Sequence, residues 1–155
     1  MDSGPPTQFV IISDLHTLED HARGSESKGL LLVVALLKEI LPKIPTLFPS
    51  VDWTAASATS GMCLELSTYL HDQLESRSIV SQLLAGDLEV APKSWLEHYV
   101  NLLKMEGYWL TVDLAASQLA RFQGKQLIAL IVGPDWDSLT DALHRTYGWW
   151  TAPHR

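Results

Sequence analysis

The chain has 155 residues, of which 46% are hydrophobic and 19% are charged, and this balance predicts one compact domain, residues 1–155, rather than a disordered chain. The formal net charge of −7 argues against a surface that binds nucleic acid or an anionic membrane. The single cysteine, Cys63, excludes an intramolecular disulfide framework, and the longest apolar run, residues 29–37, is too short to span a bilayer.

The first half of the chain is predicted to begin with a buried strand at residues 8–14, because β-branched and aromatic residues are frequent there. A loop is predicted at 21–29. Apolar residues then form a broad helical face over 28–43, where two prolines end the pattern. The Pro-, Ser- and Thr-rich segment 45–61 is predicted to be a long connection.

The second half is predicted to contain more strands than helices. In order, we expect a helix at 62–76, a strand at 78–84, a turn at Gly86-Asp87, a β-hairpin at 94–114 that turns near 105–107, a strand at 126–133 and a closing helix at 137–150. Since helices come first and strands follow, the sequence predicts an α+β fold with an antiparallel sheet. Residues 56–155 form its core, and residues 1–55 either cap that core or complete it.

Cys63 follows Ser60-Gly61 at the start of the predicted helix. A helix N-terminus stabilises a thiolate through its N–H groups and its dipole, and the thiolate is the form of cysteine that attacks electrophiles. Free cysteines are also common in protein cores. On position alone, a buried structural cysteine is therefore the better interpretation of Cys63.

The predicted hairpin gives Cys63 two partners. If the turn is centred between Met105 and Glu106, His98 lies directly opposite Asp113 on the same face of the sheet. Directly opposed side chains have Cβ atoms roughly 4.5–5.5 Å apart, which allows an imidazole to meet a carboxylate. A nucleophile, a base and a group that orients the base are the parts of a catalytic triad.

The order of these residues, with Cys at the head of a helix and His and Asp on successive strands, resembles the papain-like superfamily. The segments GMCLELSTYL, HYVNLL and WLTVDLAASQL are similar to its compact bacterial branch, which includes toxin-type domains that are protein-glutamine deamidases or cysteine peptidases. In that branch a G-x-C…S helix is followed by a His at a strand start and by D-x-T-A-x-Q-F. The resemblance covers residues 58–122 and implies a papain-like fold, in which N-terminal helices, including the Cys-bearing helix, pack on an antiparallel sheet.

The resemblance also implies roles for individual residues. Cys63 matches the nucleophile, His98 the general base and Asp113 the orienting carboxylate, while Gln118 matches the Gln of the last motif and supports the site. The chain departs from the family at Ser57, where papain-type peptidases carry a Gln that donates to the oxyanion. Oxyanion donors are therefore expected from the Cys63 backbone and its neighbours, and two tryptophans flank the predicted site. The residues predicted to form the oxyanion hole and substrate site are Ser57, Thr59, Ser60, Trp95, Trp109 and Gln118.

These features predict a thiol enzyme that acts on amide bonds through a thioester, by glutamine deamidation or peptide hydrolysis, and that requires no metal or organic cofactor. The expected partners are a protein substrate and a cognate inhibitor or immunity protein. The alternative is a papain-like domain without catalysis that acts as a binding or adaptor module.

A remote alternative is a metallophosphoesterase. The sequences QFVIISDLH and LLAGDLEV resemble the first two metal motifs of calcineurin-like phosphoesterases, with Asp14, His16 and Asp87 as ligands. Val90 stands where the second motif needs Asp, and no G-N-H or G-H-x-H segment follows. A solvated turn is the better interpretation of the acidic and histidine residues at 14–21.

The N-terminal sequence MDSGPPTQ lacks the basic and then apolar layout of a signal peptide, so a cytoplasmic protein is expected. Delivery to another cell by a route that needs no signal peptide would leave no mark in the sequence and stays open.

Overall fold

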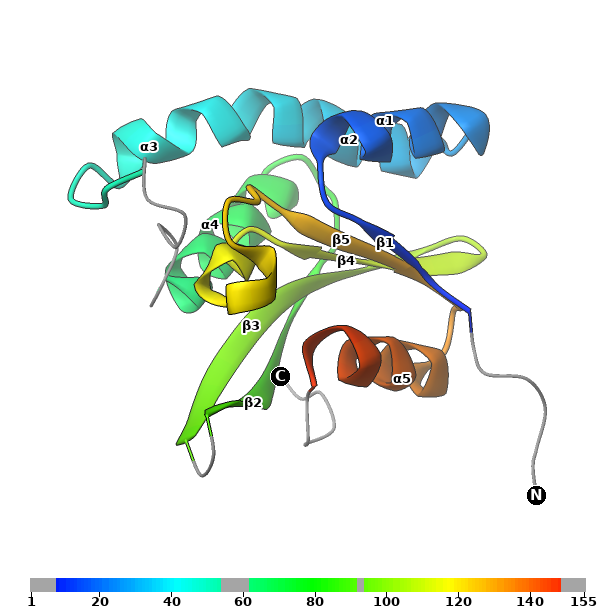
Figure 1. Ribbon diagram of the computed structural model, residues 1–155. Helices are drawn as coiled ribbons and strands as arrows, with labels where there is room; N and C mark the ends of the chain where they lie inside the picture. Colours follow the sequence, from blue (N-terminus) through cyan, green and yellow to red (C-terminus); the bar gives the residue numbers. More distant parts are fainter. Residues whose placement is uncertain (1–7, 54–61, 92–93, 149–155) are drawn as a thin grey trace, which may run out of the picture.

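The protein is an antiparallel sheet with helices on both faces, as Figure 1 shows. The computed structural model describes residues 8–53, 62–91 and 94–148. The five strands occur in the order β1-β5-β4-β3-β2, and every neighbouring pair is antiparallel. The strands are β1 (Val10–Ile12), β2 (Gln82–Ala91), β3 (Ser94–Met105), β4 (Tyr108–Asp113) and β5 (Ile128–Val132). The predicted α+β class with an antiparallel sheet is confirmed.

The helices divide between the two faces because side chains alternate along each strand. One set of strand residues, including Leu103, Leu110 and Val112, packs under α1, α2 and α4, and the alternate set, including Val100 and Leu102, packs on α5. The helices are α1 (Leu15–Gly24), α2 (Lys28–Ile40), α3 (Ile44–Leu47), α4 (Cys63–Glu75) and α5 (Trp136–Tyr147), with 3-10 turns η1 (Leu41–Lys43), η2 (Ala116–Gln118) and η3 (Ala120–Phe122). In the part of the chain that is described, no helix combines the length and hydrophobicity needed to cross a membrane.

Two of these helices matter most for the candidate site. Helix α4 buries Leu66, Leu70 and Leu74, whose spacing of four residues places them on one face. Helix α5 begins after Asp135, which accepts a hydrogen bond from the Ser138 N–H at 2.7 Å, and ends at Gly148, whose φ of 75° favours glycine.

Several predicted elements agree with the structure, and others differ. The helices at 28–43 and 62–76, the hairpin at 94–114, the strand at 126–133 and the closing helix correspond to α2, α4, β3–β4, β5 and α5. The strand predicted at 78–84 overlaps β2 only at 82–84, the buried strand predicted at 8–14 is the short strand β1 with Val10 and Ile11 exposed, and the connection predicted at 45–61 begins inside α3. The loop predicted at 21–29 is wrong in part, because α1 continues to Gly24. The turn predicted at Gly86-Asp87 is wrong, because β2 runs through both residues and pairs with β3 there.

The N-terminal segment belongs to the same core as the rest of the chain. Strand β1 pairs with β5, where Ile11 lies opposite Leu130, and α2 contributes buried residues such as Leu37 to the cluster under α4. The described part of residues 1–55 therefore completes the sheet and its cover.

Candidate active site

Cys63 is the first residue of α4, and its thiol lies against β3. The Sγ atom donates to the Glu97 carbonyl oxygen at 3.5 Å, and the residue is 8% exposed. The preceding residue, Met62, provides no side-chain cap for the helix. Among the described residues, the contact of Cys63 with β3 is the interaction that positions the start of α4.

Polar contacts hold α4 on β3 one turn beyond the thiol. The Ser67 hydroxyl lies 3.3 Å from the Tyr99 carbonyl oxygen, and the Asn101 side-chain amide donates to the Ser67 carbonyl at 2.9 Å. The register between β3 and β4 covers residues 101–105 of β3, because β4 ends at Asp113. Beyond the end of β4, the carbonyl groups of Glu97 and Tyr99 accept from side chains of α4 instead of from a strand. Cys63 therefore lies near the end of β4.

His98 and Asp113 meet inside the protein. His98 Nε2 lies 2.6 Å from Asp113 Oδ2, and the two residues are 0% and 1% exposed. Since Nε2 contacts the carboxylate, Nδ1 is the ring nitrogen that remains for another partner. Cys63 lies close enough to His98 to contribute to its raised pKa. The three residues predicted to form a triad are thus brought together.

The register that joins His98 to Asp113 differs from the predicted one. Leu102 lies opposite Thr111 rather than Trp109, so the hairpin is shifted by two residues from the prediction. The chain turns at Glu106 and Gly107, and the positive φ of Gly107, 83°, suits glycine at this position. A shift of two residues keeps each side chain on its face, so His98 reaches Asp113 diagonally instead of directly.

Asp113 accepts hydrogen bonds on both carboxylate oxygens. Its Oδ1 accepts the Ala115 N–H at 2.8 Å, and its Oδ2 accepts the Tyr147 hydroxyl at 2.9 Å in addition to His98. These donors offset the cost of burying a carboxylate in the sheet. The hydrogen bonds from Ala115 and Tyr147 hold the Asp113 carboxylate in place against His98.

Burial alone would lower the pKa of His98, but the charge of Asp113 and the hydrogen bond to it outweigh burial, with smaller contributions from Cys63. Together these interactions raise the pKa of His98 from 6.5 to about 9. An imidazolium is therefore the favoured form of His98 at neutral pH. An imidazolium next to a cysteine favours the thiolate, which is the nucleophilic form of the side chain.

This shift predicts how stability depends on pH. Because the pKa of His98 is higher in the folded chain than the ordinary value, its stabilisation is complete below pH 6.5 and is lost as pH rises through about 9. Between pH 7 and 9.5 we expect the free energy of unfolding to fall by on the order of 2 kcal/mol on this account. Urea unfolding of wild type and His98→Gln at both pH values checks this, and an equal fall in the variant contradicts it.

The sequence did not point to three residues around the site. Tyr147 comes from α5, and Glu97 and Tyr99 flank His98 on β3. The hydrogen bond of Tyr99 to the Glu97 carboxylate, with burial and with the charges of Glu97 and Cys63, raises the pKa of Tyr99 to about 12. Glu97 and Tyr99 are next to His98 in sequence but alternate with it along the strand, and no pattern singled out Tyr147.

The predicted substrate-binding residues are only partly accounted for. Trp109 lies four residues from Asp113 along β4, about 13 Å at the spacing of a strand. Its ring packs edge to face on Trp136 and lies under the Lys104 ammonium, so it belongs to the contact between the sheet and α5 rather than to the surroundings of Cys63. Ser57, Thr59 and Ser60 lie outside the described residues, as do the side chains of Trp95 in β3 and Gln118 in η2.

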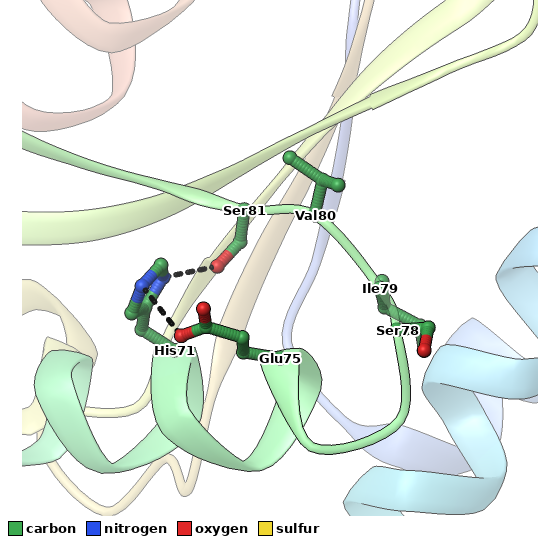
Figure 2. Close-up of a pocket in the computed structure, with 6 residues that line it drawn as sticks. All are labelled: His71, Glu75, Ser78, Ile79, Val80 and Ser81. Carbon is green, nitrogen blue, oxygen red and sulfur yellow. Dashed lines mark hydrogen bonds and ion pairs between the residues drawn. The ribbon is translucent and has the colours of Figure 1, made fainter.

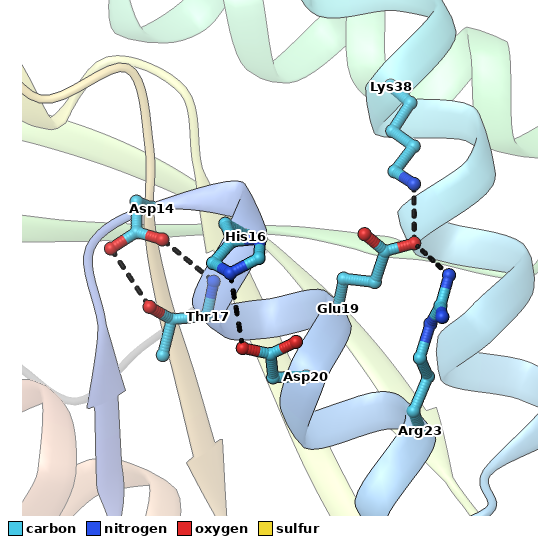
Figure 3. Close-up of polar contacts among 7 residues, drawn as sticks. All are labelled: Asp14, His16, Thr17, Glu19, Asp20, Arg23 and Lys38. Carbon is cyan, nitrogen blue, oxygen red and sulfur yellow. Dashed lines mark hydrogen bonds and ion pairs between the residues drawn. The ribbon is translucent and has the colours of Figure 1, made fainter.

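The acidic and histidine residues at 14–21 have other roles, shown in Figure 3. Asp14 caps α1 by accepting the Thr17 N–H at 2.7 Å, and His16 pairs with Asp20 at 3.4 Å. Asp14 follows β1 and Asp87 lies in β2, the two outer strands of the sheet, which are separated by about 19 Å at ordinary strand spacing. Asp14 and Asp87 therefore lie at opposite edges of the sheet, and this arrangement does not favour a shared pair of metal ions.

The other end of α4 carries a separate pocket of about 450 Å³, lined by both polar and apolar side chains (Figure 2). His71 Nδ1 lies 2.8 Å from the Ser81 hydroxyl, and its Nε2 lies 3.6 Å from a Glu75 carboxylate oxygen. Among the described residues, His71, Asp72 and Glu75 are the group whose potential metal-binding atoms gather within 4.8 Å of one another. The pocket begins two turns of helix away from Cys63 and does not include the candidate triad.

Comparison with protein-family models, with curated proteins and with solved structures finds no match to this chain. The resemblance to papain-like domains therefore depends on the residues that carry it and on the geometry around Cys63.

Proposed function

We propose that this protein is a thiol enzyme of papain-like type that hydrolyses amide bonds, with Cys63 as nucleophile, His98 as general base and acid, and Asp113 as the residue that orients His98. The observation that carries the proposal is the buried His98–Asp113 pair, with Nε2 2.6 Å from Oδ2, placed where the second ring nitrogen can serve Cys63. A structural core cysteine has no need of such a pair.

The chemistry follows from these positions. The Cys63 thiolate attacks the carbonyl carbon of a carboxamide, and the resulting tetrahedral oxyanion collapses by breaking the C–N bond. The His98 imidazolium gives its proton to the departing ammonia or amine, which leaves a thioester on Cys63. Neutral His98 then takes a proton from water as the water attacks the thioester. The products are a carboxylate and the free thiol, whether the substrate is a glutamine side chain or a peptide bond.

Intact-mass analysis of protein substrates tests this function. With casein as a glutamine-rich unfolded substrate, deamidation adds about one dalton per site, crosslinking removes about seventeen, and peptide hydrolysis gives fragments. We expect wild type to produce the first or third of these changes and Cys63→Ala to produce none. A change that also occurs with Cys63→Ala would show that another group, or a contaminant, is responsible.

One observation favours the alternative of a binding domain without catalysis. Cys63 is only 8% exposed, and its thiol is engaged with the Glu97 carbonyl, as in a structural cysteine. The two functions differ in thiol reactivity, since a structural cysteine reacts slowly with alkylating reagents and independently of a histidine. The alkylation experiment that opens the Discussion distinguishes them.

A further inference from the structure

Tyr147 is the last residue of α5, and it reaches the candidate site from the face of the sheet that α5 covers. Its hydroxyl donates to Asp113 Oδ2 at 2.9 Å, and its ring lies 5.5 Å from the His98 ring between centroids. The Tyr147 ring also packs edge to face with the Phe122 ring, with centroids 5.9 Å apart. The side chain is buried, so the hydroxyl has Asp113 rather than solvent as its partner.

We propose that Tyr147 is a positioning residue of this site, and that its hydroxyl holds the Asp113 carboxylate in the orientation that points His98 Nδ1 toward Cys63. This inference depends on the proposed function for its role in catalysis. Tyr147 touches neither the thiol nor a reacting bond, so it acts through Asp113.

The hydrogen bonds on the Asp113 carboxylate explain how Tyr147 can orient His98. The Ala115 N–H binds Oδ1, and Oδ2 is shared by His98 Nε2 and the Tyr147 hydroxyl. The carboxylate plane turns by rotation about the Cβ–Cγ bond, and each donor that binds an oxygen restricts this rotation, so a second donor on Oδ2 holds the plane more firmly than His98 and Ala115 alone. Because His98 follows the carboxylate through its 2.6 Å contact, a fixed carboxylate gives a fixed imidazole.

The charges around the hydroxyl keep it a neutral donor. Burial raises the pKa of Tyr147 well above its ordinary value, the charge of and hydrogen bond to Asp113 raise it further, and Arg121 acts in the opposite direction. The groups that face this network are Asp113 from β4, His98 from β3, Cys63 from α4 and Arg121 from η3. The hydroxyl therefore stays protonated over the range in which His98 titrates.

Tyr147→Phe tests the role, because it keeps the ring against His98 and Phe122 and removes only the hydroxyl. Tyr108→Phe is the matched control, since it removes a tyrosine hydroxyl that lies 2.7 Å from the Ser27 hydroxyl near the turn of the hairpin. We expect Tyr147→Phe to slow iodoacetamide alkylation at pH 7 about threefold, a part of the advantage that His98 provides and the effect of losing one ordinary hydrogen bond. We expect Tyr108→Phe to match wild type.

A proton NMR signal provides a second readout that does not depend on Cys63. The Nε2–H of His98 is buried against Asp113, so it should give a slowly exchanging downfield resonance in wild type and in Tyr108→Phe. In Tyr147→Phe we expect this resonance to broaden and exchange faster. An unchanged resonance and an unchanged alkylation rate would overturn the inference.

The two readouts also separate the two proposals. If wild-type Cys63 reacts slowly, the proposed function fails, and the NMR signal still decides whether Tyr147 holds the His98–Asp113 pair. If wild type reacts fast and Tyr147→Phe behaves like Tyr108→Phe in both experiments, the function stands and the role of Tyr147 is wrong.

Discussion

Cys63 is expected to react with iodoacetamide at pH 7 about tenfold faster than an ordinary thiol, and His98→Gln is expected to lose this advantage. An ordinary thiol, with a pKa of about 8.5, is only a few per cent thiolate at this pH, whereas an imidazolium beside the sulfur favours the thiolate. The variant keeps a side chain of similar size with an N–H for Asp113. Because Cys63 is the only cysteine, the mass of the intact chain reports its reaction directly.

His71→Ala is the matched control for this experiment. His71 lies on the same helix as Cys63, and its ring contacts Ser81 and Glu75 instead of the thiol. The control should therefore alkylate at the wild-type rate. If wild type reacts no faster than free cysteine, or if His98→Gln reacts as fast as wild type, Cys63 is a structural residue and the proposed enzyme is wrong.

Asp113→Ala is expected to lower the free energy of unfolding by about 3–5 kcal/mol at pH 7, the cost of removing one partner from a buried ion pair. The substitution leaves His98, the Tyr147 hydroxyl and the Ala115 N–H without their common acceptor. Urea denaturation followed by circular dichroism measures the loss. The pH dependence should also reverse, because burial alone lowers the pKa of His98 and a neutral buried imidazole is more stable at higher pH.

Asp141→Ala provides the comparison for this substitution. Asp141 pairs with Arg145 at 3.1 Å on the partly exposed side of α5. Pairs of this kind contribute about 0–1 kcal/mol, so we expect a small change and no reversal with pH. If the two variants unfolded at the same urea concentration, the His98–Asp113 pair would not stabilise the fold.

The face of the sheet that His98 and Asp113 share could be predicted from sequence, but the register could not. Alternation along 94–114 places His98 and Asp113 on one face, and any shift by an even number of residues preserves this result. The turn is positioned by Gly107, because a glycine adopts its positive φ without strain. Composition alone could not decide where within residues 105–107 the chain turns.

The errors in secondary structure also have physical reasons. Gly86 and Asp87 have the composition of a turn, yet Gly86 lies opposite His98 in the middle of a strand pair. Pairing with β3 therefore outweighs the local preference for a turn. Helix α1 buries only Leu18 and Ala22, so its apolar pattern is too weak to predict a helix. The N-cap residue Asp14 is the one feature of the sequence that indicates its start.

Tyr147 shows what a pattern within one segment cannot provide. It is 34 residues from Asp113 in sequence, and the face of α5 that carries it reads as ordinary core. Only the packing of α5 across the sheet places its hydroxyl on the carboxylate.

The sequence separation of the contacts in the candidate site has a consequence for the order of folding. His98 and Asp113 are 15 residues apart within a single hairpin, whereas the contact between Cys63 and the Glu97 carbonyl spans 34 residues and two different elements. Closing a longer loop costs more chain entropy, by about 0.6 kcal/mol for each doubling of its length. We therefore expect His98 and Asp113 to pair while the chain is still partly folded, and Cys63 to dock on β3 later. A reactive cysteine would then exist only in the fully folded protein.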